Sequence, residues 1–145
     1  MKAIGVIIVL LALVGAIVPQ FTDCASQGRA LTLANGNTVP MKCHWTAEAA
    51  LAVGIPLTVL GVLFFFSKRK ETQRSLSILG LFLGASYVLL PTVLIGVCSM
   101  PEMLCNSIMR PTLILTGALT MVACVIALVL SWKPEEPAML AGSAA

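Results

Sequence analysis

Cysteines are the residues of this sequence with the clearest chemistry. Of the five cysteines, four lie in two polar intervals between hydrophobic runs, and they are Cys24, Cys43, Cys98 and Cys105. In an oxidising compartment four cysteines form two disulfides, for which three pairings exist. The pairs Cys24–Cys43 and Cys98–Cys105 are preferred because each interval holds two cysteines. Pairing between the two intervals stays open.

Other side chains in the same intervals could bind a soft metal ion or a haem. The candidate ligands are Met41, Cys43, His44, Met100, Met103 and Cys105. Thiolate and thioether sulfur suits Cu(I), and His44 could instead serve as an axial ligand to a haem. A cysteine in a disulfide cannot donate a thiolate, so the metal and disulfide hypotheses compete. The disulfide hypothesis is preferred, and no cofactor is expected.

The polar intervals alternate with four hydrophobic runs. The chain has 145 residues, of which 59% are hydrophobic and 10% are charged, whereas about a quarter of the residues in a soluble domain are charged. The runs are residues 3–21, 47–66, 76–97 and 111–132. Each is close to the roughly 20 residues that a helix needs to cross a bilayer, and exposed non-helical backbone is not tolerated there. The sequence therefore predicts an all-α four-helix transmembrane bundle in one domain.

Basic residues set the expected orientation. The short interval 67–75 carries four Lys and Arg residues, which places it in the cytoplasm. Both termini, including the tail 133–145, are then cytoplasmic, and the cysteine intervals 22–46 and 98–110 are extracytoplasmic in a plasma (inner) membrane. The first run is expected to be an uncleaved anchor, because no small-x-small cleavage site follows it. Clustered basic residues at helix ends do not make a nucleic-acid surface.

Glycines in the runs predict where helices pack closely. Gly80 and Gly84 form a small-xxx-small pattern, and Gly54 and Gly61 lie two turns apart in the second run. Small residues let helix backbones approach. Packing inside one four-helix bundle is preferred to a homodimer interface.

The first cysteine interval also contains a hairpin signal. Asn35-Gly36 separates residues 31–34 from residues 37–40, and this dipeptide suits a type I′ turn. A small hairpin is marginal alone, so a disulfide-supported extracytoplasmic cap is expected around it. Thr46 is expected to cap the second helix.

A thiol–disulfide oxidoreductase is the enzymatic alternative. Four spans with a cysteine pair in each outer loop are similar to the arrangement of the quinone-linked disulfide-generating enzymes of the DsbB type. This resemblance implies Cys43 as the reactive thiol, Cys98 and Cys105 as a relay pair, and a bound quinone. The first outer loop lacks the Cys-x-x-Cys of those enzymes, because Cys24 and Cys43 are 19 positions apart. A non-enzymatic role is therefore favoured.

Two motifs taken together resemble a bacterial family over nearly the whole chain. Met-Lys-Cys-His-Trp-Thr-Ala, residues 41–47, opens the second run, and Cys-x-x-x-x-Met-x-Cys runs from Cys98 to Cys105. This combination resembles the four-span membrane proteins known as domain of unknown function 4418. Members are often encoded near ABC-transporter permease and ATPase genes. The resemblance implies an accessory subunit that binds another membrane protein, such as an ABC-transporter permease.

Overall fold

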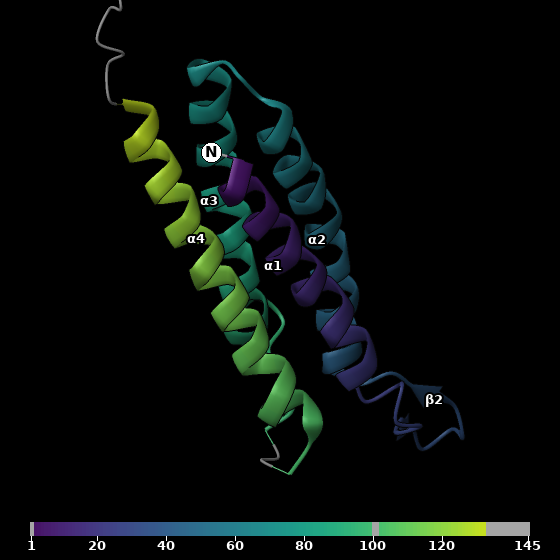
Figure 1. Ribbon diagram of the computed structural model, residues 1–145. Coiled ribbons are helices and arrows are strands. Elements are labelled where there is room, and N and C mark those ends of the chain that lie inside the picture. The colour runs from purple at the N-terminus through teal and green to yellow at the C-terminus, as the bar shows by residue number, and fades with distance from the viewer. Residues whose placement is uncertain (1, 100–101, 133–145) are drawn as a thin grey trace, which may run out of the picture.

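The computed structural model describes residues 2–99 and 102–132, which form a bundle of four long helices (Figure 1). The helices are α1 (Lys2–Thr22), α2 (Lys42–Phe66), α3 (Lys70–Leu89) and α4 (Arg110–Trp132). Each is part of a helical segment long and apolar enough to cross a membrane. Large apolar side chains such as Phe21 and Phe82 point outward, with 75% and 69% of their surface exposed. The predicted all-α four-span architecture is confirmed.

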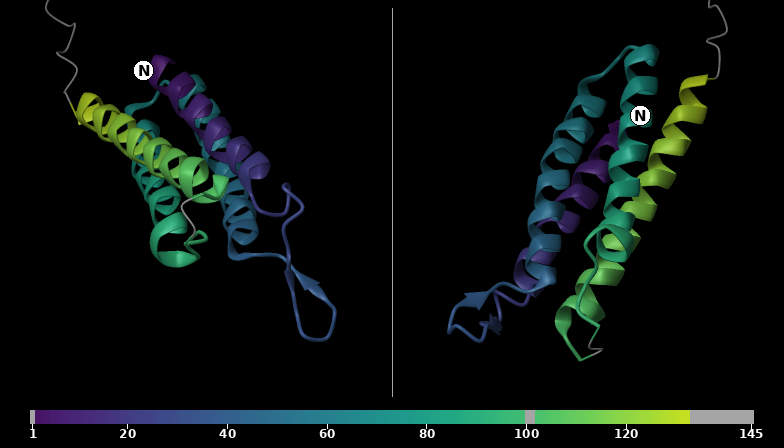
Figure 2. Two further views of the ribbon diagram at one scale, coloured as in Figure 1. Left: turned by 90° about the horizontal axis from the view of Figure 1, so that it is seen from below. Right: turned by 180° about the vertical axis from the view of Figure 1, so that it is seen from behind.

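The helices pack as two hairpins. Helix α1 packs mainly on α2 and α3 mainly on α4, while contacts of α1 with α4 and of α2 with α3 join the pairs. The start of α1, the turn 67–69 and the end of α4 lie at one end of the bundle (Figure 1). We call this the basic end. The opposite end, where residues 23–41 and the α3–α4 connection lie (Figure 2), is the cysteine end.

Two helices begin earlier than the hydrophobic runs. Helix α2 begins at Lys42 rather than residue 47, and α3 at Lys70 rather than residue 76. The residues added to α3 include Lys, Glu, Gln and Arg, which are good helix formers, and a helix start is set by backbone hydrogen bonds rather than by hydrophobicity. The predicted cap at Thr46 is wrong, because α2 begins four residues before it. The N-cap is Met41, which makes no side-chain capping hydrogen bond, and Thr46 lies inside the helix.

Two π-helical segments flank the α3–α4 connection. They are η1 (Leu90–Leu94), which continues α3, and η2 (Cys105–Met109), which leads into α4. Pro91 lies in the first and Pro111 lies just after the second. A proline has no N–H to donate and its ring clashes with the preceding turn, and a π turn is one way for a helix to absorb this disruption. Both irregular segments lie at the cysteine end.

A short hairpin projects from the cysteine end (Figure 2). Strands β1 (Leu31–Thr32) and β2 (Thr38–Val39) pair antiparallel, as the sequence predicts. The predicted type I′ turn is wrong. Gly36 has φ +82°, but no non-glycine residue of the described chain has positive φ, whereas type I′ requires it at both central positions. The Leu33 N–H donates to Asn37 O and the Gly36 N–H donates to Leu33 O, which is a three-residue loop closed by a glycine bulge.

Glycines lie where the helices approach most closely. A Cβ on Gly54 would lie 2.7 Å from the hydroxyl of Tyr87, and one on Gly80 would lie 2.5 Å from Cys124 Sγ. One on Gly61 would lie 3.0 Å from the backbone nitrogen of Val9. Gly84 faces Gly117 across the α3–α4 contact, where a Cβ would meet the Gly117 carbonyl oxygen at 3.1 Å.

The α3–α4 contact gives a stability prediction. A Cβ at Gly117 would lie 2.7 Å from the Gly84 carbonyl oxygen, and backbone cannot move aside as a flexible side chain can. Gly117→Ala is therefore expected to lower the free energy of unfolding in detergent by about 1–3 kcal/mol. Val125→Ile adds the same methyl group to a side chain that is 46% exposed and should leave the stability unchanged. Equal effects of the two variants would contradict the close approach.

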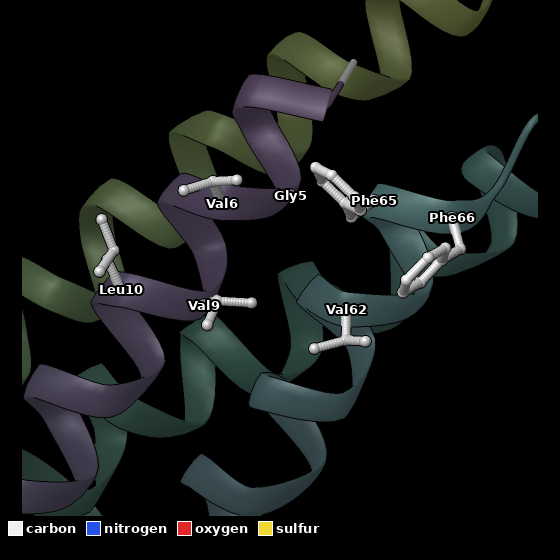
Figure 3. Close-up of a pocket in the computed structure, with 7 residues that line it drawn as sticks. All are labelled: Gly5, Val6, Val9, Leu10, Val62, Phe65 and Phe66. Carbon is white, nitrogen blue, oxygen red and sulfur yellow. The ribbon is translucent and has the colours of Figure 1, made fainter.

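A groove of about 230 Å³ runs between α1 and α2 near the basic end. Its walls are Gly5, Val6, Val9, Leu10, Val62, Phe65 and Phe66. Figure 3 shows these side chains, all of them hydrocarbon, on the two facing helices. None of the side chains that line the groove is polar or ionisable. The groove can therefore contact lipid, but it has no group that could bind a metal ion or take part in a reaction.

Candidate functional site

The side chains that can do chemistry gather at the cysteine end. The Sγ atoms of Cys24, Cys43, Cys98 and Cys105 all lie within 4.8 Å of one another. Cys98 Sγ is 3.6 Å from Cys43 Sγ, and Cys24 Sγ is 3.8 Å from Cys105 Sγ and 3.9 Å from Cys98 Sγ. All are free thiols in the structure. We call these four residues the four-cysteine cluster.

The cluster receives one cysteine from each of four backbone segments. Cys24 follows the end of α1, Cys43 is the second residue of α2, Cys98 follows η1, and Cys105 opens η2. Cys43 and Cys105 therefore lie at the starts of helical segments. The cluster joins the α1–α2 hairpin to the α3–α4 hairpin.

A turn after α1 fixes the position of Cys24. The carboxylate of Asp23 accepts a 2.8 Å hydrogen bond from the Ser26 N–H through Oδ1, and the Ser26 hydroxyl donates to the Asp23 carbonyl oxygen at 2.8 Å. Asp23 Oδ2 lies 3.0 Å from His44 Nδ1. Burial alone would raise the pKa of Asp23, but the hydrogen bonds from Ser26 and His44 outweigh it and lower that pKa. The ionised Asp23 thus ties the segment of Cys24 to the first turn of α2.

A second hydrogen bond between two segments of the chain positions Cys98. The hydroxyl of Thr46, which is fully buried, donates to the Gly96 carbonyl oxygen at 2.7 Å. Gly96 has φ +80°, a left-handed conformation that favours glycine, and it turns the chain away from η1 two residues before Cys98. This hydrogen bond holds the start of the α3–α4 connection against α2, beside Cys43.

The Thr46 tie can be tested by removing its hydroxyl. Thr46→Val keeps the side-chain shape but deprives the Gly96 carbonyl of this donor, which should lower the free energy of unfolding by about 1–3 kcal/mol. It should also make Cys98 react faster with a small alkylating reagent. Thr58→Val is the matched control, because the Thr58 hydroxyl donates to Gly54 O in its own helix. Unchanged alkylation of Cys98 in Thr46→Val would contradict the positioning role.

Exposure differs within the cluster. Cys43 and Cys105 are completely buried and Cys24 is 2% exposed, whereas Cys98 is partly exposed. Burial and the neighbouring thiols of Cys43 and Cys105 raise the pKa of Cys24 well above its usual range. In the free protein this thiol is therefore protonated at neutral pH, and a metal ion that binds it must displace the proton.

The structure regroups the residues that the sequence singles out. Cys43 and Cys105, two of the predicted metal ligands, lie in the cluster, and they are joined by Cys24 and Cys98, which are not among the ligands predicted from the sequence. His44 lies outside it, with Nδ1 bound to Asp23. Met41 and Met103 pack against the buried core that contains the cysteines. Met100 and the tail 133–145 lie outside the described residues.

Two observations bear on the disulfides. Three sulfur pairs at 3.6 to 3.9 Å join cysteines of different intervals, and the preferred pairs Cys24–Cys43 and Cys98–Cys105 are also within 4.8 Å. Since the structure has free thiols, both the disulfides and their pairing remain predictions.

The comparisons with known proteins give one match. The family described as Domain of unknown function (DUF4418) matches residues 3–130. No curated protein and no solved structure matches the chain. The geometry of the four-cysteine cluster is therefore the best indication of function.

Proposed function

This chain belongs to the DUF4418 family of unknown function, and we propose that it is a membrane protein that binds one soft metal ion through the four-cysteine cluster. The observation that carries the proposal is the spacing of the sulfur atoms. Four sulfurs at about 2.3 Å from a central ion lie about 3.8 Å apart at the corners of a tetrahedron. Three of the Sγ–Sγ distances are 3.6, 3.8 and 3.9 Å, and all lie within 4.8 Å.

The surroundings of the cluster support metal binding. The hydrogen bonds Asp23–His44 and Thr46–Gly96 hold the backbone on both sides of the cluster. Thiolate sulfur selects soft or borderline ions such as Cu(I) and Zn²⁺ over Mg²⁺ and Ca²⁺. A preorganised set of four such ligands therefore favours a tightly held thiophilic ion.

The same geometry makes a thiol–disulfide oxidoreductase a weaker candidate. Such enzymes need an accessible thiol of low pKa. Cys43, the reactive thiol in that hypothesis, is completely buried, and the pKa of Cys24 is raised. Haem binding is a separate hypothesis, because the contact of His44 Nδ1 with Asp23 leaves Nε2 free for a ligand.

The two predicted disulfides are the competing hypothesis, and one experiment separates them. Thiols are alkylated in intact cells before lysis, and the purified protein is analysed by mass spectrometry with and without reduction. In parallel, protein purified without chelators is assayed for metal content. We expect about one thiophilic ion per chain, no disulfide, and protection of the four cluster cysteines from alkylation until the metal is removed. Two disulfides in protein trapped in this way would overturn the proposal.

The partner-binding role remains a separate proposal. The family resemblance implies it, and the hairpin that projects beyond the helices (Figure 1) carries exposed Leu31, Leu33 and Val39.

An extracytoplasmic location of the cluster in a bacterial inner membrane, with both termini inside, is proposed on the basic residues near the turn 67–69. Cysteine-substitution labelling of position 35 from outside intact cells would test this orientation.

A further inference from the structure

The exposure of the four cysteine side chains indicates the route by which an ion reaches the cluster. Three of the four thiols are buried, with at most 2% of their surface exposed, and Cys98 alone is partly exposed. An ion that arrives from solvent therefore meets Cys98 before the others.

A hollow of about 380 Å³ lies beside Cys98. Its walls include three sulfur-containing side chains, those of Met41, Cys98 and Met103, together with Lys42 and Ser99. The two methionines are partly buried and pack against the core that contains the other three cluster cysteines. Two methionine side chains thus line a hollow that borders the four-cysteine cluster.

The methionines hold equivalent places in the two halves of the site. Met41-Lys42-Cys43 and Met103-Leu104-Cys105 are both Met-x-Cys triplets, and each ends at a helix N-terminus. Met41 is the N-cap of α2, and its carbonyl oxygen accepts from the His44 N–H at 3.0 Å. The Met103 carbonyl oxygen accepts from the N–H groups of Asn106 and Ser107 at 3.0 and 3.1 Å. Both backbones are therefore fixed beside the cysteine that follows.

From this arrangement we infer that the ion is monovalent copper, and that Met41 and Met103 receive it in the hollow and pass it to Cys98 and the rest of the cluster. Thioethers bind Cu(I) and are poor ligands for harder divalent ions. The described residues that line the hollow include no acidic side chain, and their one charged group is the cation Lys42. Such a hollow repels a divalent cation more than a monovalent one.

The transfer is an exchange of ligands at constant oxidation state. A coordinate bond from copper to a methionine sulfur breaks as a bond to the Cys98 sulfur forms, and the Cys98 thiol releases its proton to water. Copper stays as Cu(I) throughout, so no electron donor or acceptor is needed. The inference rests on the proposed metal function and adds the identity of the ion and its route.

The test compares the rate and the extent of copper uptake. Full-length reduced protein in detergent is mixed with the coloured Cu(I)–bicinchoninate complex, and loss of colour is followed in time. Met41→Leu/Met103→Leu keeps the volume and apolar character of both side chains. We expect this variant to take up Cu(I) about tenfold more slowly, an effect of the size that loss of an outer-shell partner has at metal sites, and to reach the same final stoichiometry. Zn²⁺ uptake, followed with a zinc dye, should not differ between the variant and the native protein.

Met121→Leu is the matched control, because Met121 lies within α4 at Gly84, away from the cluster. It should take up Cu(I) at the native rate. An unchanged rate in the double variant, or native protein that binds Zn²⁺ but not Cu(I), would overturn the route and leave the metal function standing. Native protein that binds neither ion after full reduction would overturn both.

Discussion

Cys43→Ser and Cys105→Ser are each expected to lower the affinity for the metal ion by more than about 100-fold, because loss of an outer-shell partner alone costs about 10- to 100-fold. Both side chains are completely buried in the cluster, so water cannot easily replace the missing ligand. A serine hydroxyl is a hard, neutral donor and does not substitute for a thiolate at a soft ion. The measurement is a competition titration of the reduced protein against a chromogenic chelator.

Cys124→Ser is the control for these variants. Cys124 is also completely buried, but it lies within α4 beside Gly80, outside the cluster. It should keep native affinity, and helix content measured by circular dichroism should be the same in all three variants. Native affinity in Cys43→Ser with intact helices would contradict a four-sulfur site.

The membrane helices could be predicted because their signal is local. An apolar run of about 20 residues has few alternatives to a membrane helix, and three of the four runs lie wholly in such helices. The third, predicted as residues 76–97, extends three residues too far, because the helical segment ends at Leu94 and the chain turns at Gly96, which has φ +80°. The starts of α2 and α3 were missed because a helix is limited by backbone hydrogen bonding and not by hydrophobicity. Lys42 and Lys70 both begin helices, although neither belongs to an apolar run.

The cluster could not be predicted in the same way because it is a tertiary feature. Three of its sulfur pairs, 3.6 to 3.9 Å apart, are separated by 55, 74 and 81 positions in the sequence. Topology indicates that two outer loops share one face, but it does not bring four sulfur atoms within contact of one another. That depends on the early start of α2, which draws Cys43 into the first turn of a helix, and on the turn at Gly96, which directs the chain toward Cys98.

His44 shows why residue type alone gave an incomplete ligand set. Its neighbours in sequence suit a metal site, but His44 lies outside the four-cysteine cluster, and its Nδ1 atom lies 3.0 Å from Asp23. A repeated pattern was available in the sequence, because Met-x-Cys occurs before both helix starts. It becomes informative only once the two triplets are known to face the same hollow.

Removal of the metal is expected to destabilise the whole bundle. The cluster takes Cys24 and Cys43 from the α1–α2 hairpin and Cys98 and Cys105 from the α3–α4 hairpin, so a bound ion ties the two hairpins together. A ligand present at about 1,000 times its dissociation constant stabilises the state that binds it by about 4 kcal/mol. Unfolding in SDS, followed by the fluorescence of Trp45 and Trp132, should therefore begin at a lower SDS fraction after treatment with a strong chelator.

Cys43→Ser separates this effect from any direct action of the chelator on the helices or the micelle. The variant lacks one ligand, so its unfolding curve should be the same with and without chelator, and it should lie close to that of the metal-free native protein. Added Cu(I) should restore the stability of the native protein but not that of the variant. If the native protein lost its metal and unfolded at an unchanged SDS fraction, the ion would not bridge the two hairpins, and the cluster would have to be held together by packing alone.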